Sequence, residues 1–158
     1  MNIKDYLLSE LFDSNVPIRF KAKDEHKENS VYYYEFAIDD LMYNFTAEIY
    51  TDRHGIEGEK RILNMEFALG DFYSRKDYHI TGTGNALQVF SAVKQCVLDL
   101  FNKRLKEKPD IISFSADDEE PSRVKLYDRF MKIIPRILKD FKFHKKIFDE
   151  YIYKKKGT

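Results

Sequence analysis

The stretch between Asn64 and Arg129 constrains the fold more than any other part of the chain. An apolar strand at residues 62–69 leads into a glycine-containing turn, and a long amphipathic helix and a second strand, residues 111–115, follow it. A helix that connects two strands of one sheet usually returns the chain in the same direction. We therefore expect these two strands to lie parallel, or nearly so.

The turn His79-Ile80-Thr81-Gly82-Thr83-Gly84 stands at the junction of this strand and the helix. The first N–H groups of a helix have no partner within the helix, and the helix dipole favours negative charge beside them. A glycine turn at a helix start is therefore suited to hold a phosphate group. The alternative is a turn in which glycine only accommodates a positive φ angle.

The residues before this stretch alternate between apolar and polar in the manner of antiparallel strands. We expect such strands at residues 18–22, 31–36 and 41–49, after a short helix at 5–12, and a hairpin loop at 51–60.

The residues after the glycine turn predict two helices and a terminal strand region. The first helix should run for about six turns toward Lys108-Pro109. The second should begin at Pro121, and Pro135 should kink or divide it. The tail from Phe141 to Tyr153 should form one or two strands. Together these elements predict a single α+β domain over residues 1–158, with helices packed on the faces of a mixed, largely antiparallel sheet.

The composition bears on partners and location. The 27 basic residues balance 27 acidic ones, which argues against nucleic acid as a partner. Cys96 is the only cysteine, so no internal disulfide can form, and its helical apolar surroundings predict a small buried side chain. We find no signal-type apolar segment and no run of the ~20 apolar residues that a membrane span needs, so we expect a soluble cytoplasmic protein without membrane contact. Nor do the four histidines have the spacing of a metal site.

The strand, glycine turn and helix resemble the acetyl-CoA-dependent N-acetyltransferases of the GNAT superfamily. That family has a Gln/Arg-x-x-Gly-x-Gly/Ala turn, and His79, Gly82 and Gly84 stand at the matching positions, followed by Asn85-Ala86-Leu87. The segment Ser122–Tyr127 is similar to the family's helix after the fifth strand, which supplies a tyrosine beside the cofactor sulfur. The chain also resembles small acetyltransferase-like proteins carried by tailed phages, which would place it in a host cytoplasm or a virion.

The resemblance implies that acetyl-CoA is a cosubstrate and that an amine is acetylated. The residues it assigns to cofactor binding are His79, Thr81, Gly82, Thr83, Gly84, Asn85 and Ala86. Tyr127 would be the catalytic acid. Glu66, on the strand face opposite Phe67, is the first candidate for the base, and Glu48 is the second.

Each assignment has a simpler alternative. The glutamates could be ordinary solvent-facing strand residues, and Tyr127 could be a core residue, since it shares a stripe with Val124 and Met131. The whole chain could be a catalytically inactive binding or assembly protein with the same fold, such as a phage accessory or virion component. The tyrosine-rich strand at residues 32–34 favours that alternative, because tyrosines are common in interaction surfaces.

Overall fold

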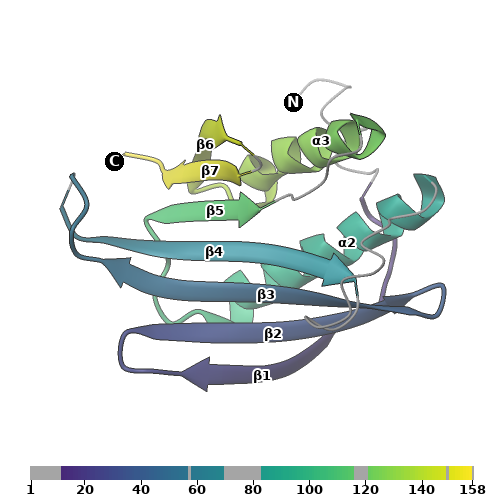
Figure 1. Cartoon of the computed structure of the whole chain (residues 1–158), viewed down its shortest axis with the longest axis horizontal. Coiled ribbons are helices and arrows are strands. Elements are labelled where there is room, and N and C mark those ends of the chain that lie inside the picture. The colour runs from purple at the N-terminus through teal and green to yellow at the C-terminus, as the bar shows by residue number, and fades with distance from the viewer. Residues whose placement is uncertain (1–11, 57, 70–82, 116–120, 149, 158) are drawn as a thin grey trace.

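The described part of the protein is one mixed seven-stranded sheet with helices α2 and α3 on one side (Figure 1). The computed structural model describes residues 12–56, 58–69, 83–115, 121–148 and 150–157. The strands lie in the order β1-β2-β3-β4-β5-β7-β6. Their bounds are β1 Arg19–Glu25, β2 Asn29–Ile38, β3 Leu41–Asp52, β4 Lys60–Leu69, β5 Ile111–Ser115, β6 Phe141–Ile147 and β7 Glu150–Lys155. The single-domain α+β class and the largely antiparallel sheet are therefore confirmed.

The predicted parallel pair is also confirmed. β4 and β5 run parallel, whereas all other neighbouring strands in the described sheet are antiparallel. The connection between them contains helix α2, Thr83–Asp99, which runs diagonally across the sheet (Figure 1). Helix α3, Pro121–Ile137, follows β5.

Both described helices pack against the same face of the sheet. Phe67 of β4 lies 5.6 Å from Phe90 of α2, between ring centroids, and Phe114 of β5 lies 5.9 Å from Phe130 of α3. The rings of Phe90 and Phe130 are themselves 4.9 Å apart. The prediction of helices on both faces is therefore not met within the described residues. The reason is that the strands place their largest apolar side chains on one side only.

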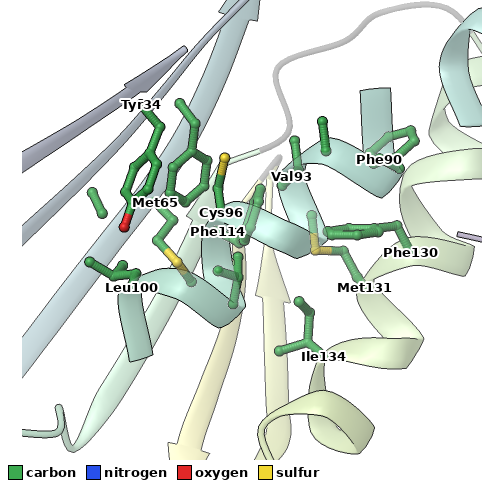
Figure 2. Packing of buried hydrophobic residues seen from close by; sticks show 14 of the residues in the cluster. Tyr34, Met65, Phe90, Val93, Cys96, Leu100, Phe114, Phe130, Met131 and Ile134 are labelled. Carbon is green, nitrogen blue, oxygen red and sulfur yellow. The ribbon is translucent and has the colours of Figure 1, made fainter. Parts of the chain in front are cut away.

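A dense aromatic and aliphatic core fills the space between the helices and the sheet (Figure 2). Phe12 packs into it, with its ring 5.8 Å from Phe90 and 5.5 Å from Phe130. The helix expected at residues 5–12 lies outside the described residues except for this position. Cys96 lies in the same core, among Val93, Met65 and Phe114, as predicted (Figure 2). Burial raises the pKa of its thiol far above the ordinary value.

The first helix changes form at its end. The α-helical part stops at Asp99, and a π-helical turn, Leu100–Arg104, follows in place of the expected continuation toward Lys108. This wider turn brings Arg104 back to Asp99, whose carboxylate accepts hydrogen bonds from Arg104 Nε at 3.3 Å and from the Tyr34 hydroxyl at 2.6 Å. Burial opposes the charge of Asp99, but these hydrogen bonds outweigh it and lower the pKa of Asp99.

Pro135 neither divides nor ends α3, which continues to Ile137. Proline has no N–H to donate to the carbonyl four residues earlier, here that of Met131. The Tyr153 hydroxyl of β7 donates to this carbonyl instead, at 2.6 Å. The helix is therefore not divided at Pro135, and a strand residue satisfies the carbonyl that proline leaves free.

None of the helices in the described ranges has both the length and the apolar character that crossing a bilayer requires.

The hairpin between β2 and β3 is strained. Ile38 pairs with Leu41, so the loop has two residues, Asp39 and Asp40, with φ angles of 51° and 65°. Such loops favour glycine or asparagine because other side chains meet steric opposition at positive φ. We expect Asp40→Gly to raise the free energy of unfolding in urea by about 0.5–1 kcal/mol. The control, Asp24→Gly in β1, should lower it, because glycine weakens a strand. A loss of stability in Asp40→Gly would contradict this interpretation of the turn.

The Tyr153–Met131 hydrogen bond can be tested by a double-mutant cycle. Tyr153→Phe should lower the free energy of unfolding by about 1–3 kcal/mol, because it leaves a buried carbonyl without a donor. In a Pro135→Ala background the restored N–H can donate to the Met131 carbonyl, so the same substitution should cost clearly less. Equal costs in both backgrounds, measured by urea unfolding, would show that Pro135 is not the reason for this bond.

Candidate functional site

The strands β4 and β5 stop pairing halfway along β4. Their register runs from Ile62↔Ile111 to Met65↔Phe114. β5 ends one residue later, whereas β4 continues as residues 66–69, which pair with β3 alone. Within the described residues, the edge of β4 that faces β5 is therefore without a strand partner from Glu66 onward.

A pocket of about 250 Å³ lies at this point, on the face of the sheet that no described helix covers. We call this face the open face. Three strands contribute short polar side chains, and glutamates from three strands stand among them. The lining residues are Thr46, Glu48, Asn64, Met65, Glu66, Ser115 and Glu150.

The pocket is acidic. Glu48 accepts a hydrogen bond from Asn29 Nδ2 at 2.6 Å, and Glu150 accepts one from the Ser113 hydroxyl. Among the described residues, no ion pair involves Glu48, Glu66 or Glu150. Three carboxylates without a cationic partner create a negative potential that favours a cation. The described residues contain no group of three His, Cys, Asp or Glu side chains arranged to hold a metal ion.

Glu66, predicted as the base, lies in this pocket. Its side chain is exposed on the open face, opposite Phe67, and the second candidate Glu48 lines the same pocket. The sequence pattern placed both glutamates on the correct face. It did not show that β3, β4 and β7 would bring three glutamates together.

Tyr127, predicted as the acid, lies on the helix-covered side of the sheet. It is only 6 % exposed; its ring stacks on Phe67 at 5.7 Å and meets Phe90 edge-on at 5.0 Å. Glu66 and Phe67 are consecutive residues of β4, so Tyr127 and Glu66 lie on opposite faces of one strand. The structure therefore does not bring the two predicted catalytic residues together on one face.

The predicted phosphate-binding residues fall partly within the described chain. Thr83, Gly84, Asn85 and Ala86 form the first turn of α2, so the helix begins inside the predicted glycine turn. His79, Thr81 and Gly82 lie outside the described residues. The N–H groups of a first helical turn lack partners within the helix, which is the property the sequence argument used.

Sequence reasoning missed Glu150 and Ser115. They meet the pocket because β7 inserts between β5 and β6, which pairs Ser115 with Glu150. A partial signal existed, since Glu150 alternates with the buried residues Tyr151 and Tyr153 and must point the other way.

Comparison of the chain with protein-family models, curated proteins and solved structures finds no significant match.

Proposed function

We propose that the protein is an acyl-CoA-dependent N-acyltransferase that moves an acetyl group from acetyl-CoA to an amine held in the acidic pocket. One observation carries the proposal: Glu66 lines a pocket with three carboxylates that have no ion-pair partner among the described residues, at the point where the parallel strands β4 and β5 part. The resemblance of the chain to the GNAT superfamily supplies the cosubstrate.

The chain offers acetyl-CoA two kinds of backbone group. The edge of β4 at residues 66–69 has pairing groups on its β5 side that are not used by a strand within the described residues, and an extended pantetheine arm can hydrogen-bond to such an edge. The N–H groups at residues 83–86 begin α2 and suit a diphosphate. These two features fit a CoA thioester as substrate.

The three carboxylates attract the amine as its ammonium ion. For reaction the ammonium must lose a proton, and in this proposal Glu66 accepts it directly or through one water. The amine nitrogen then forms a bond to the thioester carbonyl carbon. As the carbon–sulfur bond breaks, the nitrogen gives up its second proton and becomes an amide, and the departing thiolate takes up a proton, so that the second nitrogen proton replaces the one given to sulfur. Tyr127 is the proposed donor of that proton, from the helix-covered side of β4.

One observation favours the second candidate, a catalytically inactive binding or assembly protein. Tyr127 is packed between Phe67 and Phe90 like an ordinary core residue. If its hydroxyl never reaches a thioester, the fold would serve only as a scaffold.

Cofactor binding is tested by thermal melting with acetyl-CoA and with desulfo-CoA. At a ligand concentration about 100 times the Kd, binding stabilises the folded state by about 2.7 kcal/mol, so Tm should rise by several degrees with either compound. Gly82→Val should abolish the rise, because a β-branched residue blocks close approach of the backbone. Unchanged melting of the unaltered protein at millimolar ligand would leave only the scaffold candidate.

The role of Glu66 is tested by Glu66→Gln, which keeps the shape of the side chain and removes the base. We expect thiol release from acetyl-CoA, with spermidine and lysine peptides as acceptors, to fall by about 10²–10⁴-fold. The shift in Tm with desulfo-CoA should persist. The matched control is Glu59→Gln, an exposed glutamate outside the pocket, which should keep full activity. Equal rates in the two variants would exclude Glu66 as the base.

A further inference from the structure

The net charge of zero conceals a strong charge separation along the chain. Residues 129–156 contain ten Lys and Arg but three Asp and Glu, a net charge of +7. The remaining residues therefore carry −7. Such asymmetry between parts of a chain is typical of proteins that bind polyanions.

The fold gathers much of this positive charge on α3 and β6. β6 is an edge strand of the sheet, and Lys142, Lys145 and Lys146 are exposed along it. Arg129 and Lys132 are exposed on α3. The two elements are adjacent, because Asp128 of α3 lies 3.6 Å from Lys146 Nζ, and Lys132 follows Asp128 by one helical turn. We call these five cationic residues the basic surface. Lys146 lies on the α3 side of β6, whereas Lys142 and Lys145 pair with Lys154 and Ile152 and point to the open side.

Two aromatic rings are exposed among these cations. Phe143 is 53 % exposed and Phe148 is 93 % exposed. Phe148 has a φ angle of 52°, which is unfavourable for a bulky side chain. Five residues of extended chain span about 16 Å, so the two rings are far enough apart to contact different groups of one long ligand.

Protection of the sheet edge explains only part of this arrangement. Lysines and an irregularity in register, which β6 has between Phe143 and Lys145, commonly prevent strand addition. Both features argue against a peptide that adds to β6 as an eighth strand. They do not explain the cations on α3. Nor do they explain why a bulky, exposed ring stands at position 148, where the backbone has a positive φ angle.

A membrane surface fits less well than a nucleic acid. Insertion into lipid needs apolar side chains gathered on one side. Phe143 rests on Tyr153, which faces α3, whereas Ile147 pairs with Glu150, which faces the open side. The exposed apolar residues thus point to different sides of β6 and are interleaved with lysines. Cations interleaved with exposed rings are typical of surfaces that bind single-stranded nucleic acid through phosphate contacts and base stacking.

We propose that the basic surface, with Phe143 and Phe148, binds single-stranded nucleic acid. The lysines and arginine contact phosphates, and the two rings stack on bases. The proposed surface covers α3 and both sides of the edge strand β6, and none of its residues lines the acidic pocket.

The test uses the full chain and a fluorescein-labelled 15-nucleotide thymidine strand, followed by fluorescence anisotropy. We expect binding at 50 mM NaCl that weakens steeply with salt. Lys142→Gln/Lys145→Gln should weaken it and reduce the slope of log K against log salt by about 1.4, since each single-strand phosphate contact contributes about 0.7. The matched control, Lys21→Gln/Lys27→Gln at the opposite sheet edge, removes the same charge and should leave both values unchanged.

Phe148→Gly separates stacking from folding. Glycine adopts the φ angle of this position readily, so the variant should be at least as stable as the unaltered protein. Its affinity for the thymidine strand should nevertheless fall by about tenfold, with an unchanged salt slope. Four results would each overturn the proposal. The first two are unchanged affinity in Phe148→Gly and no binding at 100 µM protein and 50 mM NaCl. The others are equal losses in the control variant, and binding to vesicles of 20 % phosphatidylserine in phosphatidylcholine without binding to the strand.

Discussion

The structure depends on the one-sided distribution of large apolar side chains along the strands. From β2 to β5 the buried rings and aliphatic chains point toward α2 and α3, and the alternate positions carry short or charged groups such as Thr46, Glu48 and Asn64. One face of the sheet therefore supplies the hydrophobic free energy of folding. The other face of the sheet contributes little to that core, so its side chains are available for a binding or catalytic site. The acidic pocket lies on this second face because packing against the helices does not use its residues.

Much of the fold followed from periodicity in the sequence. The four-strand antiparallel run, the crossover helix and the parallel β4–β5 pair were predicted because alternation and helical spacing are strong local signals. The predicted strands were too short: β2 begins at Asn29 and β3 extends to Asp52, because cross-strand pairing extends strands into residues whose own preferences are weak. The sequence-based predictions were less accurate where the local structure depends on a contact with a residue far away in the chain. Pro135 does not divide α3, and Tyr153 of β7 donates to the carbonyl that proline leaves free; the π-helical turn is stabilised by Tyr34, more than 60 residues earlier in the chain.

In the candidate site, too, the features set by local sequence patterns were predicted and those set by distant contacts were not. Alternation along one strand placed Glu66 opposite Phe67, and this local inference was right. Neither the contribution of Glu150 nor the separation of Tyr127 from Glu66 was visible in the sequence, since each depends on strand order or on which face a helix covers. Composition had a related weakness: a total charge of zero gave no sign that cations gather around α3 and β6.

The lone thiol of the core has a practical consequence. Cys96 is fully buried between the helices and the sheet, and burial disfavours its reactive thiolate form. Only an opening that parts α2 from the strands exposes it to an alkylating reagent. The protein thus carries a built-in reporter of such openings, whose labelling rate measures the free energy that holds the two layers together.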